Sequence, residues 1–323
     1  MGPSARRHSA PKLVVSFCIL LFLAAVVASP SQAQWNVSAE FLYWEPVGTG
    51  ADAGIVKKGL TDTFPTRATG PIEGIDHGFA PGVRLTAGWD PVRVSWTYFR
   101  ATETFSEACP PTVNCLLQAP RLALLAVNSA SAKSVISLQM VDLDLRPQLV
   151  ATDRLTSHWF IGFRFAELKS SLRVHYATAG VVLPGVETFD ADAKNDMFGL
   201  RTGIDGRYKL FQQFDVEGMF ALSALRGQSE ARLTDTFVQF TFPPEASNGT
   251  RLERDTVVPV VELGLRAIWT PVKNLDVWVG YEFLQFFNVF RATIIASRRA
   301  NLEGELDRNV GFHGLQAGVR WRF

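Results

Sequence analysis

Hydrophobic and polar residues alternate strictly along the last ten residues of the chain, 314–323, which read GLQAGVRWRF. One face of an extended chain carries only the apolar residues Leu315, Ala317, Val319, Trp321 and Phe323, and the other carries glycine, glutamine and arginine. Because successive side chains of a β-strand point to opposite faces, this pattern predicts a strand between an apolar and a polar medium. It favours the closing strand of a transmembrane β-barrel over an ordinary half-buried strand, with lipid on one side and the lumen on the other.

Nine further segments alternate in the same way and predict strands over residues 35–44, 82–89, 92–99, 141–146, 159–166, 198–208, 214–223, 261–269 and 275–283. The connections are alternately long and short, and the long ones run up to His77, over 101–134, 170–195 and 227–256, and up to Val310. These features predict an all-β fold: a transmembrane antiparallel up-and-down β-barrel of about ten strands, with long outer loops and short periplasmic turns. Eight strands is an alternative. Twelve would result if residues 235–242 and a neighbouring segment entered the membrane.

Aromatic residues fall near the short-turn ends of the predicted strands, namely Trp89, Trp159, Tyr208, Trp269 and Trp321. Such residues form belts at membrane interfaces, which favours the barrel over a soluble β-sandwich. Two stretches of the long connections have a pattern of their own. Residues 116–127 are apolar without strict alternation and predict a short helix, whereas residues 236–242 alternate and predict a hairpin above the membrane.

The N-terminus has the pattern of an export signal. Arg6, Arg7 and Lys12 precede an apolar run from residue 13 to 28, and small residues stand before a cleavage point after Ala33. We therefore expect a signal peptide over residues 1–33 and an outer-membrane β-barrel over 34–323. An uncleaved anchor is the alternative. Because the exported chain would meet an oxidising compartment, Cys109 and Cys115 are expected to form a disulfide that closes a small loop.

Composition excludes several functional classes. The 32 basic and 31 acidic residues nearly cancel, which argues against a nucleic-acid partner. After the N-terminal segment no apolar run approaches the length of a transmembrane helix. There is no glycine-rich phosphate loop and no zinc-ligand pattern, so we expect no cofactor and no metal. Ser157 and His158 are adjacent and would point to opposite faces, which predicts no Ser–His pair there and no enzymatic activity.

Charged residues occupy the inward phase of the predicted strands in near balance, nine basic against nine acidic. They are Glu40, Arg84, Arg93, Asp142, Asp144, Arg146, Arg164, Arg201, Asp205, Arg207, Asp215, Glu217, Glu262, Arg266, Asp276, Glu282, Arg320 and Arg322. Two interpretations follow. The charges either line a narrow hydrated pore that acts on passing solutes, or form an ion-pair network that braces the wall and fills the bore.

The chain resembles the pore-forming major outer-membrane proteins of the Legionella type. The segments that carry this resemblance are AEFLYW at 39–44, FGLRTGID at 198–205, VPVVELGLR at 258–266, VWVGYEF at 277–283 and GFHGLQAGVRWRF at 311–323. The resemblance implies a channel and defines no catalytic or ligand residues. It favours the hypothesis of a passive, porin-like pore for small hydrophilic solutes. A structural or adhesive barrel with a closed lumen is the alternative hypothesis.

The resemblance also has consequences for location and partners. It implies a bacterial outer membrane, with outer-membrane lipid around the barrel. It further implies recognition by the barrel assembly machinery, with Val319, Trp321 and Phe323 as the signal in the final strand. Homo-oligomerisation is left open by the sequence.

Overall fold

Ten long antiparallel strands dominate the computed structural model, which describes residues 35–48, 56–59, 72–73, 75–108, 116–118, 126–127, 129–178, 185–239, 245–292 and 308–323. The strands are β1 (Trp35–Val47), β4 (Ala80–Trp89), β5 (Val92–Ala108), β8 (Ser129–Leu145), β10 (Leu155–Thr178), β11 (Gly185–Lys209), β12 (Phe214–Gln239), β13 (Glu245–Val272), β14 (Leu275–Val289) and β15 (Arg308–Arg322). Each pairs with the next along the chain. In these ranges no helix is long and apolar enough to cross a membrane.

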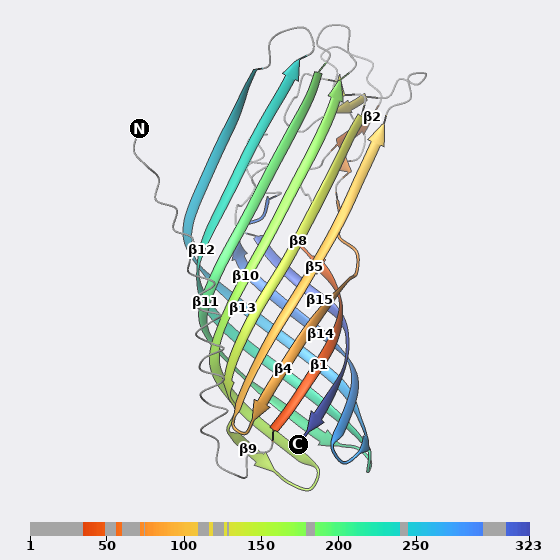
Figure 1. Cartoon of the computed structure of the whole chain (residues 1–323), viewed down its shortest axis with the longest axis vertical. Helices are drawn as coiled ribbons and strands as arrows, with labels where there is room; N and C mark the ends of the chain where they lie inside the picture. The colour runs from red at the N-terminus through yellow and green to blue at the C-terminus, as the bar shows by residue number, and fades with distance from the viewer. Residues whose placement is uncertain are drawn as a thin grey trace.

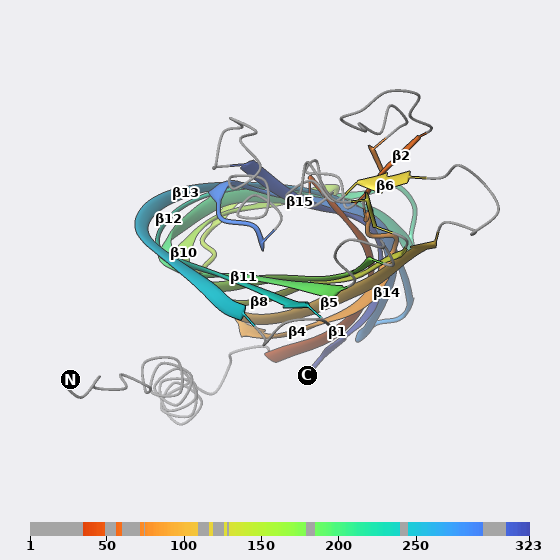
Figure 2. The same ribbon diagram turned by 90° about the horizontal axis from the view of Figure 1, so that it is seen from above.

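The first and last strands close the sheet into a barrel. β1 pairs with β4 on one side and with β15 on the other, in a register that runs from Asn36↔Arg322 to Val47↔Gly311. The backbone N–H of Phe323 donates to the carbonyl of Trp35 at 2.8 Å, which extends the seam to the last residue. Figure 2 shows the resulting ring from above. Closure leaves no strand edge of the described barrel unpaired, as a lipid environment requires, and the predicted ten-stranded barrel is confirmed.

Six of the strands run much further than their sequence pattern predicted. In Figure 1, β10 to β13 rise well beyond β1, β4 and β14, and β5 and β8 are also extended. The predicted long loops at 170–195 and 227–256 were therefore largely wrong, and the one at 101–134 was wrong at both of its ends. β12 and β13 stay paired up to Asp235↔Asn248, so they form one hairpin and the twelve-strand alternative is also wrong.

The sequence pattern missed the upper parts of these strands because the apolar residues change from the outward face to the inward face along the strand. We call this change the exchange of apolar phase. In the lower part of β11 the outward side chains Phe198 and Leu200 are exposed and apolar. Further up the same strand the apolar side chains are Ala191 and Ala193, which face inward and are buried, while the outward positions carry Asp190 and Asp192. The lower part is thus built for lipid outside, and the upper part for water outside.

The remaining strands are short. β9 (Gln148–Ala151) pairs with the start of β10, next to the turn that follows β8. A separate four-stranded sheet has the order β3 (Ile72–Glu73), β2 (Val56–Gly59), β6 (Leu116–Gln118), β7 (Ala126–Val127). The helix predicted over 116–127 is therefore wrong at both of its ends. Its centre, 119–125, and the tip of the predicted 236–242 hairpin lie outside the described residues.

Aromatic side chains mark both borders of the apolar outer surface. Near the short-turn end, the rings of Trp35 and Trp89 lie 4.8 Å apart. Trp159, Tyr208, Trp269 and Trp321 are also exposed near this end. At the upper border, Phe198 stacks on Phe163 and contacts Phe165. Aromatic side chains at both borders are typical of membrane interfaces.

The barrel interior is divided into three layers. The lowest, at the short-turn end, is polar and is described below. The middle layer consists of the buried residues Leu42, Trp44, Phe99, Ala101, Ile136, Leu138, Met140, Ala166, Leu168, Met197, Leu225, Val258, Val260, Leu284, Phe286, Val289, Val310 and Phe312. The upper layer consists of Ile75, Ala130, Ala132, Leu172, Val174, Tyr176, Phe189, Ala191, Ala193, Ala231, Leu233, Phe290 and Ala292. Side chains therefore fill the barrel at these levels.

Two segments that are not barrel strands contribute residues to the upper layer. One is the lumen strap, residues 290–292, which follows β14 after Asn288 adopts a positive φ of 60°. Asn195 holds this strap by donating from Nδ2 to the carbonyl of Phe290 and accepting from its N–H, both at 3.0 Å. The other segment, residues 75–79, precedes β4 and buries Ile75 and His77.

Candidate functional site

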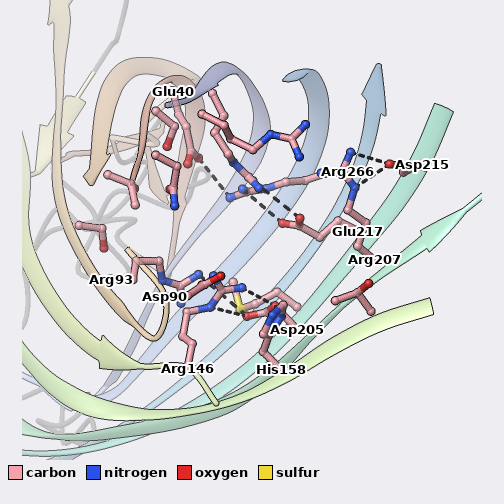
Figure 3. Close-up of a pocket in the computed structure, with 18 of the residues that line it drawn as sticks. Glu40, Asp90, Arg93, Arg146, His158, Asp205, Arg207, Asp215, Glu217 and Arg266 are labelled. Carbon is pink, nitrogen blue, oxygen red and sulfur yellow. Dashed lines mark hydrogen bonds and ion pairs between the residues drawn. The ribbon is translucent and has the colours of Figure 1, made fainter. Parts of the chain in front are cut away.

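The polar lower layer encloses a chamber of about 600 Å³. All ten barrel strands contribute side chains to its wall, because every second residue of each strand points inward. The lining reaches the turn residues Asp90 and Gln212, so the chamber has its mouth at the short-turn end. Figure 3 shows the labelled side chains converging on the chamber from several strands.

The deepest part of the chamber is an ion-pair lattice between strands that are far apart in sequence. Arg164 of β10 donates to both oxygens of Asp142 at 2.6 and 2.7 Å, and also to Glu262 of β13. Arg201 of β11 bonds the same Glu262 at 3.1 Å and Asp144 at 2.6 Å. Arg164 is 1 % exposed and Glu262 2 %. Bidentate pairing of this kind is the strongest form of charged hydrogen bond in proteins.

A second group of ion pairs, the hub around Arg84, spans the closing seam. Arg84 of β4 forms a bidentate pair with Glu282 of β14, with N···O distances of 2.8 and 3.0 Å. Its Nε donates to Thr97 at 3.0 Å, and Nη1 lies 3.4 Å from Glu40. Arg266 of β13 reaches the same Glu40 at 3.1 Å. The hub therefore links β1, β4, β13 and β14 across the lumen.

Nearer the mouth, two carboxylates each contact more than one basic side chain. Asp205 accepts from Arg146 at 2.5 and 3.1 Å and contacts Nδ1 of His158 at 3.1 Å, as Figure 3 shows. Asp276 is fully buried and pairs with Arg207 at 3.0 Å and with Arg322 at 2.7 Å.

Two aromatic rings stack against guanidinium groups in the chamber wall. Phe160 lies against Arg201 at 4.6 Å and Arg93 at 5.3 Å from the ring centroid. Trp278 lies against Arg320 at 5.4 Å and Arg266 at 5.5 Å. Cation–π attraction adds to the ion pairs and fixes the orientation of these arginines.

The structure places all of the predicted inward-facing charges inside the barrel, where each pairs with another member of the set. They are Glu40, Arg84, Arg93, Asp142, Asp144, Arg146, Arg164, Arg201, Asp205, Arg207, Asp215, Glu217, Glu262, Arg266, Asp276, Glu282, Arg320 and Arg322. Sequence reasoning missed five further residues that share the inward phase and contact these charges, namely His158, Phe160, Thr270, Trp278 and Gln316. Val319, Trp321 and Phe323 lie exposed on the outer face of the seam.

Two other sequence predictions have different outcomes. Cys109 and Cys115 lie outside the described residues, so their pairing stays a prediction. The structure also brings together a Ser–His pair that the sequence did not indicate, because Nε2 of His77 lies 3.0 Å from Oγ of Ser134. Within the described ranges, no three His, Cys, Asp or Glu residues are grouped so that they could hold a metal ion.

The chamber and the layers above it have opposite chemistry. An ion that entered from the mouth would meet paired charges and then the apolar middle layer, where Leu42, Trp44, Phe99 and Phe312 are fully buried. Phe312 contacts Trp44 and Phe99 at ring distances of 6.1 and 5.4 Å. The buried side chains of this layer are almost entirely apolar, so an ion would leave the paired charges for a medium in which its burial is costly.

Comparisons with known proteins agree with the fold. A family model described as the Legionella pneumophila major outer membrane protein precursor matches residues 28–323. No curated protein matches the chain.

Among solved structures, the outer membrane protease OmpT from Escherichia coli is similar, with a TM-score of 0.47, 12 % identity, and coverage of 91 % of this chain and 98 % of that one. A major outer membrane protein from Thermus thermophilus gives a TM-score of 0.30, 11 % identity and coverage of 90 % and 100 %. The toluene transporter TodX from Pseudomonas putida gives a TM-score of 0.28, 10 % identity, and coverage of 93 % of this chain and 91 % of that one. At these scores the neighbours carry no argument about activity.

Proposed function

We propose that this chain, which belongs to the family of the Legionella pneumophila major outer membrane protein, is a structural barrel of the outer membrane whose bore is closed to free diffusion. The observation that carries the proposal is the middle layer. Nine of the ten barrel strands contribute buried apolar side chains to it, and these fill the described part of the lumen at that level. The ion-pair lattice below braces the wall at the same time.

The porin-like passive channel is a second candidate, and the chamber favours it. Its volume of about 600 Å³ and its charged lining suit small hydrophilic solutes on the periplasmic side. Passage to the outside would require the middle layer and the lumen strap to move. The two candidates thus differ in one measurable property, which is the conductance of the resting barrel.

Single-channel recording in planar bilayers tests the proposal. The wild-type barrel should give no stable conductance steps in symmetric salt, because ions cannot cross the middle layer. A Phe312→Ser, Phe99→Ser double variant, which hydrates that layer, should conduct. Phe163→Ser, on the lipid-facing side of β10, is a matched control and should stay silent. Steady ohmic steps from the wild type would overturn the closed barrel and support the porin-like channel.

A catalytic role is disfavoured on similar grounds. The His77–Ser134 pair is the arrangement nearest to a hydrolase site among the described residues, but both side chains are buried. The cavity beside them is about 10 Å³, which admits a single water and no substrate. We therefore propose that the chain is not an enzyme.

The proposal extends to export and assembly. Residues 1–33 would act as a cleaved signal peptide, and 34–323 would form the mature barrel. Outer-membrane lipid surrounds a barrel of this family. The barrel assembly machinery is proposed as a partner that recognises the final strand.

A further inference from the structure

A cationic side chain lies in the upper apolar layer. Arg291 belongs to the lumen strap and is 4 % exposed. The strap is fixed around it, because Asn195 holds Phe290 and the hydroxyl of Ser170 accepts from the N–H of Ala292 at 2.9 Å. These bonds hold the backbone on both sides of Arg291 in place.

Arg291 has no partner within the described residues. It makes no ion pair or hydrogen bond there, and its Nε is buried without an acceptor. Burial lowers the pKa of Arg291 to about 10, and the guanidinium is still protonated at neutral pH. A buried charge without a counterion is unfavourable, so an anion beside this guanidinium would stabilise the arrangement.

A small cavity adjoins Arg291. His77, Ser134, Ser170 and Ala292 also line it, and its volume is about 10 Å³. Room for about one water molecule excludes phosphate, sulfate and carboxylate ligands. The radius of a monatomic anion such as chloride exceeds that of water by only a few tenths of an ångström, so a slight widening of the cavity would admit it.

His77 provides a second donor at this cavity. Its Nε2 lies 3.0 Å from the hydroxyl of Ser134, and its Nδ1 is buried without a partner among the described residues. Burial lowers the pKa of His77, against the raising effect of Glu103 and Asp76, so the ring is neutral at neutral pH. In the tautomer in which the Ser134 hydroxyl donates to Nε2, the ring hydrogen is on Nδ1 and is available to a ligand.

We infer that the cavity between Arg291 and His77 binds one monatomic anion of the size of chloride. A water molecule could accept hydrogen bonds from these groups but would leave the charge of Arg291 uncompensated. The anion would join the strap to β8, on which Ser134 lies, and so would stabilise the closed upper lumen. Of the two carboxylates that act on His77, Glu103 is paired with Ser134 in the sheet register. It acts against an anion at this site by charge repulsion.

The test is the thermal unfolding of the purified full-length barrel in detergent, followed by heat-modifiable gel migration. Sodium chloride is compared with sodium gluconate at equal ionic strength. Chloride and bromide should raise the transition temperature in a saturable way, whereas gluconate should not. Above the dissociation constant, a tenfold rise in chloride should lower the unfolding equilibrium constant about tenfold.

Three variants make the test specific. Arg291→Met should abolish the chloride effect, and Arg226→Met, an exposed arginine of β12, should retain it. Glu103→Gln should shift the half-maximal effect to lower chloride. Retention of the full effect in Arg291→Met would overturn the site, as would an unfolding temperature of the wild type that does not respond to chloride.

Should Arg291→Met fail to fold, wild-type crystals soaked in sodium bromide decide the question. A bromide anomalous peak beside Arg291 and His77 is expected. A map without a peak at that position, in crystals that show bromide elsewhere, overturns the inference.

Discussion

Glu262 is the residue on which the polar lower layer most depends. Its carboxylate joins Arg164 and Arg201, which come from different strands, and all three side chains are buried. A buried ion pair adds little net stability relative to an apolar pair, but removal of one partner leaves an uncompensated charge. The lattice is therefore sensitive to single changes even though its charges are balanced.

Glu262→Gln keeps the shape of the side chain and removes the charge that two guanidinium groups share. We expect the free energy of unfolding to fall by about 3–5 kcal/mol. Equilibrium unfolding by urea in lipid vesicles, read by tryptophan fluorescence, measures this. Glu217→Gln is the matched control, since its ion pairs with Arg266 and Arg320 are longer, at 3.7 Å, and the loss should be about 1 kcal/mol. Equal losses would show that the deep lattice has no special role.

The lipid-facing phase can be tested at Leu265, which lies in the middle of the apolar outer surface of β13 and is 60 % exposed. Leu265→Arg should lower the free energy of unfolding by about 2–4 kcal/mol, because a guanidinium would enter the membrane interior. Thr234→Arg on β12, above the apolar surface, should change it by only about 0.5 kcal/mol. The same urea titration measures both, and similar effects would contradict the assignment of lipid-facing positions.

At the scale of single elements, the lumen strap depends on Asn195. This side chain imitates a strand neighbour, since it both donates to and accepts from the backbone of Phe290, and Ser229 donates to it at 2.7 Å. The strap thus closes the upper lumen through side-chain rather than ladder hydrogen bonds.

Asn195→Ala should release the strap while the barrel stays closed. Loss of the buried hydrogen bonds is worth about 1–3 kcal/mol, so amide exchange at Phe290 and Ala292 should become roughly 10–100 times faster. Hydrogen-exchange mass spectrometry on the heat-modifiable protein measures this. Thr188→Ala, an outward position of the same strand, should leave exchange of the strap unchanged. Unaltered exchange in Asn195→Ala would show that the packing of Phe290 alone holds the strap.

The closing strand should be essential for insertion. Deletion of residues 319–323 removes the lower pairing of β15 with both β1 and β14, which leaves unpaired backbone groups in lipid at several kcal/mol each. We expect the truncated protein to be lost from the outer membrane fraction, as seen by blotting. A deletion of five residues within 61–70, which supplies no strand to the described barrel, should leave insertion intact. Truncated protein that is heat-modifiable and protease-resistant in cells would refute this.

The sequence predicted the parts of each strand that lipid flanks, and physical reasons explain what it did not predict. Where a strand lies between lipid and the polar lumen, apolar and charged residues alternate strictly, as in Leu263 and Glu262. The inward position of the charges could be predicted from this alternation. Above the membrane the apolar residues lie on the inward face, so Ala191 and Ala193 do not continue the outward apolar pattern of Phe198. To a reader of the sequence, this break indicates the end of the strand. The partners of each charge depend on contacts across the lumen, such as Arg84 with Glu282, which no local pattern contains.

For the whole molecule, the connections define an orientation. The turns around Asp90, Phe211 and Lys273 lie at the end where β1 begins and β15 ends, and so does the connection from β8 to β10 that contains β9. The strands β5, β10, β12 and β14 end at the opposite end of the barrel. If the short turns are periplasmic, the extended strands β10 to β13 stand outside the cell.

Epitope insertion tests this orientation. A tag placed between residues 240 and 244, where β12 and β13 are joined, should bind antibody on intact cells. The same tag after Phe211, in the turn between β11 and β12, should bind only after permeabilisation. Fluorescence of labelled cells measures both, and the reverse pattern would invert the orientation.

The exchange of apolar phase also bears on how the barrel responds to bilayer thickness. On β11 the outward face changes from Phe198 to Asp196 within two residues, and on β10 from Phe165 to Glu167. A thicker bilayer would submerge these carboxylates, and a thinner one would expose phenylalanine to water. Either shift is unfavourable, so the protein cannot change its insertion depth to match its surroundings. The lipid must adjust instead, through local stretching or compression around a barrel of fixed hydrophobic height.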